Sequence, residues 1–195
     1  MIASNRNWAA AFSHLGWCKL LTGSIEEAIA LQQQAIRLSP RDPYISIWYF
    51  RIAYGHLLQS RVDEAIVWFE KARGANPGHP RPHGCLAAAY GLKGWTERAA
   101  AELAEVQRLS DGRYSSIARL RAAGQWGLPA VQAMFEVTYF AGLRLAGMPE
   151  AEGRAPLRRN RLISAATWLT WPQLGASDEV WDFLRAAIAA ALEAG

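Results

Sequence analysis

The chain of 195 residues contains little cysteine and no long apolar run. Its two cysteines, Cys18 and Cys85, cannot build a disulfide framework, so a reducing compartment is expected. No apolar stretch approaches the roughly 20 residues that a transmembrane helix needs. The first residues also lack the apolar segment and cleavage site of a secretory signal. These absences predict a cytoplasmic protein with no membrane partner.

The chain also lacks a large excess of either charge. The 21 basic and 17 acidic residues leave a net charge of +4, and both signs are spread along the chain. Proteins that bind nucleic acids gather basic side chains on one face or stripe, so no nucleic-acid partner is expected. Hydrophobic residues make up 51% of the chain, which excludes a disordered protein and is enough for a core.

Sequence motifs of catalysis are missing. There is no phosphate-binding G-x-x-x-x-G-K-[ST], no H-E-x-x-H and no G-x-S-x-G. His79, His83 and Cys85 form an H-x3-H-x-C cluster, but a fourth metal ligand is lacking. We therefore expect no catalytic residue, no cofactor and no metal. An enzyme with an unrecognised helical active site remains an alternative.

The chain does contain an internal repeat, which aligns on three alanines. Each alanine lies twelve residues after a small residue and twelve before a helix-ending residue. The aligned triplets are Gly16–Ala28–Pro40, Ala53–Ala65–Pro77 and Ala87–Ala99–Asp111. This spacing follows the tetratricopeptide (TPR) pattern W-x2-L-G-x2-Y, A-x3-F, P over 34 residues. It predicts an all-α solenoid with repeats at 9–42, 46–79 and 80–113.

Each repeat is expected to form two antiparallel helices, A and B, that pack closely at the small residues. The predicted turns between them are 22–24, 59–61 and 93–95. Ser24 has the S-x-x-E spacing of a capping box with Glu27. Helices at 115–123 and 130–146 are expected to follow as a degenerate fourth repeat that caps a solenoid domain spanning 1–148.

Several stretches resemble the C-terminal TPR region of bacterial class III adenylate/guanylate cyclases over about residues 8–150. The stretches are RVDEAIVWFEKA at 61–72, LAAAY at 86–90, YSSIARL at 114–120, FEVTYFAGLR at 135–144 and AGMPE at 146–150. The last two are far more specific than the repeat itself. The resemblance implies a setting of cyclic-nucleotide signalling, in which a cyclase catalytic domain is one candidate partner.

Cyclase activity is not implied, because no position here matches the metal-binding aspartates of that family. The chain is therefore expected to be an interaction scaffold and not an enzyme. A structural remnant of a truncated cyclase gene, without a ligand of its own, is the competing interpretation.

The concave face of a solenoid is lined mainly by A helices. The positions that usually point there are Ser13, Trp17, Leu21, Phe50, Tyr54, Leu57, Leu58, Gly84, Ala88 and Gly91. They lack the Lys, Asn and Arg with which chaperone-binding TPR domains clamp a terminal carboxylate. We predict that an apolar helix or segment of a partner protein binds at Trp17, Phe50, Tyr54, Leu57 and Leu58. Alternatively, a catalytic domain or the chain's own tail covers these side chains.

The tail begins with a predicted linker at 149–156 and ends with an amphipathic helix at 177–193. Its apolar face carries Val180, Trp181, Leu184, Ile188 and Leu192 at helical spacing. We expect this helix to fold back onto the solenoid, with 130–146 as the favoured docking site. A partner-binding or dimerising helix is the alternative.

Overall fold

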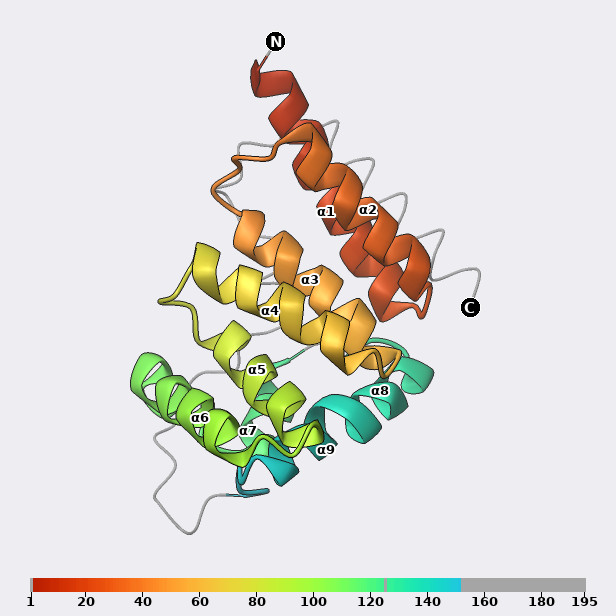
Figure 1. Ribbon diagram of the computed structural model, residues 1–195. Coiled ribbons are helices and arrows are strands. Elements are labelled where there is room, and N and C mark those ends of the chain that lie inside the picture. The colour runs from red at the N-terminus through yellow and green to blue at the C-terminus, as the bar shows by residue number, and fades with distance from the viewer. Residues whose placement is uncertain (1, 125, 152–195) are drawn as a thin grey trace.

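The computed structural model of the protein describes residues 2–124 and 126–151, and this part of the chain is helical without any strand (Figure 1). The elements are α1 (Ile2–Leu21), α2 (Ile25–Leu38), α3 (Ile45–Leu58), α4 (Val62–Ala75), α5 (Pro80–Leu92), α6 (Thr96–Ser110), α7 (Ile117–Ala123), α8 (Pro129–Phe135), η1 (Glu136–Phe140) and α9 (Ala141–Leu145). The predicted all-α class is confirmed.

The first six helices form three antiparallel pairs. α1 packs on α2, α3 on α4 and α5 on α6, and successive pairs meet through α2 against α3 and α4 against α5. This stacking fits a solenoid, and Figure 1 shows the pairs following one another from the N-terminus downward. The first helix of each pair (α1, α3, α5) is called an A helix below, and the second (α2, α4, α6) a B helix.

Small residues allow the helices of a pair to approach closely, as the repeat predicts. Ala53 and Ala87 are fully buried. A Cβ atom on Gly16 would lie only 3.0 Å from the Ala28 carbonyl oxygen and 2.6 Å from the Gln32 side-chain nitrogen. A larger residue at 16 would therefore push α2 away from α1.

The three predicted turns join the helices of each pair, and the middle residue of each turn is left-handed. The φ angles are 93° at Gly23, 59° at Ser60 and 72° at Gly94. The predicted capping box is wrong: Ser24 precedes α2, but its side chain makes no capping hydrogen bond. Its ψ angle of 64° departs from the extended backbone that carries an N-cap side chain over the first amides of a helix.

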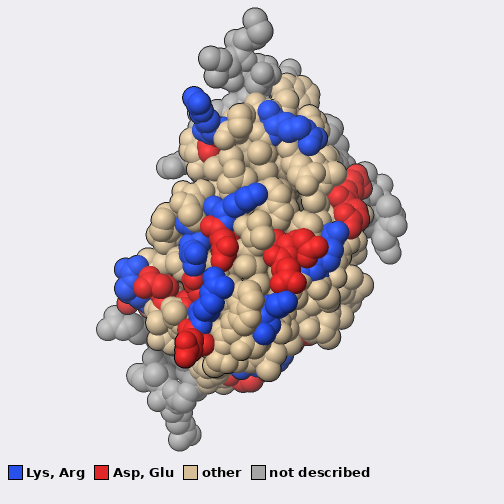
Figure 2. All heavy atoms as spheres, viewed as in Figure 1, with Lys and Arg blue, Asp and Glu red and all other residues tan. Residues whose placement is uncertain are grey.

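Ion pairs join neighbouring helix pairs at the surface. Their partners are Glu26 with Arg61 (3.1 Å), Asp63 with Lys93 (2.8 Å) and Glu70 with Arg98 (3.1 Å). Figure 2 shows that acidic and basic side chains are intermingled on the face of the molecule seen in that view. Exposed pairs of this kind add little stability, so the packing of the small and apolar residues holds the pairs together.

The last helical segment takes a different place from the fourth repeat expected from the sequence. α8, η1 and α9 run on without a break as one helix with a π-helical stretch in its middle. α9 and η1 pack on α5, and α8 and η1 also contact α3. The segment thus lies across two A helices, on the side where the sequence predicts a partner groove.

Glycines make this docking possible. A Cβ atom on Gly91 of α5 would lie 2.3 Å from the Gly142 carbonyl oxygen, and one on Gly142 would lie 2.3 Å from the Ala88 carbonyl oxygen. The backbones of α5 and α9 therefore touch. The small residues predicted to form one side of the groove are the surface on which the chain's own last helix rests.

The AGMPE stretch holds α7 in place. The backbone N–H groups of Ile117 and Ala118 donate hydrogen bonds of 2.9 Å to the carbonyl oxygens of Pro149 and Glu150. Arg121 of α7 pairs with Glu136 at 2.8 Å through two nitrogens. Pro149 and Glu150, which the sequence interpretation assigns to a linker, are thus bonded to α7. Residues 152–156 of that linker and the predicted helix at 177–193 lie outside the described residues.

Candidate functional site

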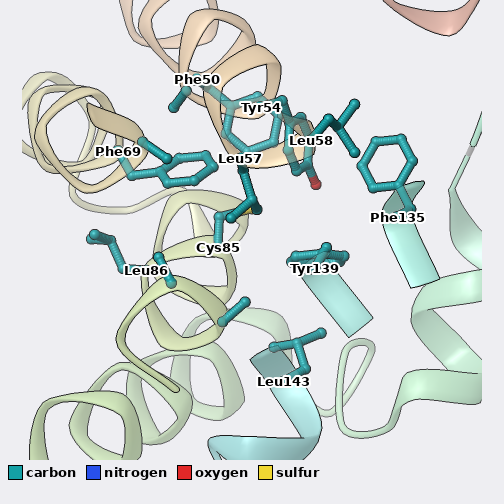
Figure 3. Packing of buried hydrophobic residues seen from close by; sticks show 14 of the residues in the cluster. Phe50, Tyr54, Leu57, Leu58, Phe69, Cys85, Leu86, Phe135, Tyr139 and Leu143 are labelled. Carbon is teal, nitrogen blue, oxygen red and sulfur yellow. The ribbon is translucent and has the colours of Figure 1, made fainter. Parts of the chain in front are cut away.

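Most of the predicted groove residues lie in the core. Phe50, Tyr54, Leu57 and Leu58 are all buried, and α8 and η1 of the segment 129–145 contact their helix, α3. The Tyr54 ring packs edge-on against Phe135 and Tyr139, with ring centroids 5.3 and 5.9 Å away (Figure 3). Within the described residues, the chain itself therefore covers Tyr54 with its segment 129–145.

Part of the concave face stays open as a cavity of about 300 Å³. Trp17, Phe50 and Tyr54 line it, whereas Leu57 and Leu58 are not among its lining residues. The structure therefore brings three of the five predicted residues together at an accessible site. This volume is at the lower end of the range for ligand pockets and accommodates one or two amino-acid side chains.

Trp126 and Tyr139 form an aromatic wall of this cavity. Their rings stack with centroids 5.9 Å apart, and the Trp126 indole donates a 2.9 Å hydrogen bond to the Arg121 carbonyl oxygen. A Cβ atom on Gly124, which follows α7, would lie 2.3 Å from the Trp126 ring. The end of α7 thus makes room for Trp126 and fixes it at the site.

Two arginines that the sequence analysis missed also line the cavity. Arg51 projects from α3 and Arg81 from the start of α5. The Arg51 guanidinium lies 5.4 Å from the Trp17 ring centroid, and Arg81 lies among the phenol groups of Tyr54 and other tyrosines. Within residues 2–124 and 126–151, no carboxylate forms an ion pair with either arginine, and none of the lining side chains is acidic.

A buried polar network positions Arg51. Its guanidinium donates hydrogen bonds to the Ser13 carbonyl oxygen (2.9 Å) and hydroxyl (2.7 Å). Ser13 and Gln32 are buried and bonded to each other twice at 2.7 Å. Gln32 stands where the TPR pattern has Phe, so this departure from the pattern was the signal in the sequence that could have indicated the site.

The charge of the cavity is positive at neutral pH. Burial, together with the nearby Arg81, lowers the pKa of Arg51 to about 10, which leaves the guanidinium protonated. Burial and the same Arg81 charge lower the pKa of His79, which is therefore neutral at pH 7. The two arginines alone supply the formal charge among the described lining residues.

The H-x3-H-x-C residues do not converge on a common point. The His79 ring accepts a 3.2 Å hydrogen bond from the Arg81 backbone N–H, and His83 is bonded to Glu102 at 2.6 Å. Cys85 is fully buried, and burial raises its pKa to about 12. In the part of the chain that the structure describes, no three His, Cys, Asp or Glu side chains could hold a metal ion together.

No family model matches the chain, and no curated protein matches it either. The resemblance to the cyclase TPR region therefore rests on the sequence stretches themselves. Among the described helices, none is long and apolar enough to cross a bilayer.

A second apolar surface lies on the outer side of the last helix. Met134, Val137 and Leu145 are exposed there, Val137 to 71%. This is the side of 130–146 that remains open to the docking predicted for the tail helix.

The burial of His14 near Arg51 gives the protein a predicted pH dependence. The His14 ring is bonded to the Ala10 carbonyl oxygen at 2.7 Å, and burial and the Arg51 charge lower its pKa from 6.5 to about 4. The unfolded chain therefore binds this proton first, so stability contributed by His14 is complete above pH 6.5 and is lost as the pH falls to 4. We expect the free energy of unfolding to drop by about 2–3 kcal/mol across this window.

Urea unfolding at pH 7, 5.5 and 4 measures this loss. His14→Gln keeps a polar side chain but cannot titrate, so the variant should lose less stability than the wild type over the same range. Equal losses in the two proteins would show that the His14 proton is not responsible.

Proposed function

We propose that the protein is a TPR-type interaction module whose concave cavity receives an apolar side chain from a segment of a partner protein. The three stacked helix pairs and the buried small residues at 16, 53 and 87 support the TPR assignment. The observation that carries the binding proposal is the open cavity lined by Trp17, Phe50 and Tyr54.

A pocket of this kind suits a protein partner. Apolar and aromatic side chains that fill a concave pocket contribute most of the binding energy at many interfaces. The last helix fills the rest of the groove and fixes Tyr54 against Phe135 and Tyr139. A preformed cavity costs less free energy to occupy than a groove that must first be ordered.

The signalling setting rests on the resemblance to the cyclase TPR region. Glu136 and Glu150 of its most specific stretches each form an ion pair with Arg121 of α7, and Arg144 pairs with both carboxylates. These residues support a shared fold and give no catalytic role. We therefore propose a module of cyclic-nucleotide signalling that makes no nucleotide itself, with a cyclase catalytic domain as one candidate partner.

Selection from a library of random peptides displayed on phage tests the proposal. We expect the selected peptides to share an apolar residue and to bind Trp17→Ala roughly tenfold more weakly than the wild type. Trp95→Ala is the matched control, because Trp95 is partly exposed at the turn before α6 and lies outside the cavity lining. Its affinity for the peptides should not change.

The competing interpretation, a structural remnant without a ligand, expects a different result. In that case the selection returns no peptide that distinguishes Trp17→Ala from Trp95→Ala. Thermal unfolding of both variants separates a loss of binding from a loss of the fold.

A further inference from the structure

We propose that the cavity recognises an acidic side chain beside the apolar one, with Arg51 and Arg81 binding the carboxylate of a partner's Asp or Glu. This inference rests on the proposed function and names the chemistry of the segment that the cavity takes. The partner is thus a protein segment in which an apolar residue is adjacent to an acidic one.

The first argument is that the two positive charges lack an internal counter-charge. Arg51 and Arg81 line one cavity, and within the described residues neither is paired with a carboxylate. Several other arginines of the described chain are paired with a carboxylate, such as Arg73 with Glu102 and Arg121 with Glu136. Partly buried guanidinium groups are costly to leave without an anion, and an incoming carboxylate offsets that cost.

The second argument is that Arg51 is already held in position. The Ser13 carbonyl oxygen and hydroxyl each accept a hydrogen bond from its Nη1 atom, and buried Gln32 fixes Ser13 in turn. A buried Gln at a core position costs free energy unless its hydrogen bonds are made. Gln32 therefore stands in place of an apolar core residue and, through Ser13, holds the Arg51 guanidinium at the cavity. This is expected of a preorganised binding group.

The third argument is that apolar and cationic surfaces share one small space. Trp17 faces the Arg51 guanidinium at 5.4 Å, and the stacked Trp126 and Tyr139 rings form another wall. A volume of about 300 Å³ holds roughly two side chains, so the apolar and acidic residues of the ligand must be neighbours. Guanidinium groups bind planar carboxylates through paired hydrogen bonds, which favours Asp or Glu.

The test compares two capped peptides on the full chain: acetyl-Gly-Ser-Phe-Glu-Leu-Ser-Gly-amide and the same peptide with Gln in place of Glu. Neither carries a terminal charge, so they differ by one carboxylate. Titration calorimetry at low salt should give a dissociation constant roughly tenfold lower for the Glu peptide. Added salt should shrink the difference, because screening weakens the charge interaction.

Variants assign the preference to the two arginines. Arg51→Met and Arg81→Met should each abolish most of the preference for Glu over Gln, whereas Arg51→Lys should keep part of it. Arg108→Met is the control, because Arg108 is exposed and pairs with Glu105 outside the cavity. Thermal unfolding checks that every variant is folded.

The outcomes separate this inference from the proposed function. If both peptides bind equally and Trp17→Ala weakens both, the acidic preference is wrong and the apolar pocket stands. If the Glu preference persists in both Met variants, the carboxylate binds elsewhere and the inference is overturned. If neither peptide binds at millimolar concentration, the acidic recognition and the apolar pocket both fail.

Discussion

Replacing Ala65 with glutamate is expected to abolish the cooperative fold of the helix pairs. Ala65 lies in α4 without any exposed surface, at the repeat position shared with Ala28 and Ala99, which are also buried. A carboxylate there has no room and no partner, and burying it costs on the order of 4 kcal/mol or more. Such a loss is a large part of the roughly 5–15 kcal/mol that stabilises a typical domain.

Thermal unfolding followed by circular dichroism measures this effect. Val67→Glu is the matched control, because Val67 lies one half-turn away on the same helix and is 50% exposed. The control should unfold within a few degrees of the wild type, while Ala65→Glu should show no folded baseline at 25 °C. A nearly unchanged midpoint for Ala65→Glu would mean that the repeat phase is wrong.

The second large effect is expected at the contact between α5 and α9. Gly142→Val places side-chain atoms where a Cβ atom already lies 2.3 Å from the Ala88 carbonyl oxygen. Because both sides of this contact are backbone, neither can yield without moving a helix. We expect the free energy of unfolding to fall by about 3–5 kcal/mol, because the last helix is displaced from α5. This is comparable with the most destabilising core substitutions.

Displacement of the last helix would uncover Tyr54, which packs against Phe135 and Tyr139, so binding of a hydrophobic dye should rise in Gly142→Val. Most of the far-ultraviolet helix signal should persist, since the three helix pairs do not include α9. Ala133→Val is the control, because it also introduces a valine side chain, but at an exposed position of the same helix. Unchanged stability and dye binding in Gly142→Val would contradict the backbone contact.

Local features of the fold could be predicted from the sequence because they depend on neighbouring residues. The turns at 22–24, 59–61 and 93–95 each carry a residue that adopts a left-handed conformation, and Pro40 and Pro77 follow the B helices closely. The buried alanines were predictable from their regular spacing. Ser24 shows the limit, since a capping motif works only where the backbone angles allow it.

The position at which the last helix packs was not predictable in this way. Its helical character follows from Pro129 at the start and Gly147 at the end, but its place depends on a contact between residues about fifty positions apart. The small residues Gly84, Ala88 and Gly91 predicted one side of a groove without showing what fills it. The packing of Gly142 on Ala88 and Gly91 shows that the last helix fills this side of the groove.

The cavity was predicted only in part for the same reason. Trp17, Phe50 and Tyr54 were found from their repeat positions, but Arg51 and Arg81 occupy positions that the pattern leaves free. Their meeting depends on the angle between α3 and α5 and on the network through Ser13 and Gln32. Gln32, a polar residue at a core position of the repeat, was the signal that could have indicated it.

The central claim is that the concave cavity binds the partner segment, and nuclear magnetic resonance tests it most directly. The measurement is of nuclear Overhauser effects between the phenylalanine ring of the Glu peptide and the protein. The account predicts contacts with Trp17, Trp126 and Tyr139, which line the cavity. Contacts confined to Met134, Val137 and Leu145, on the exposed outer side of the last helix, would contradict it.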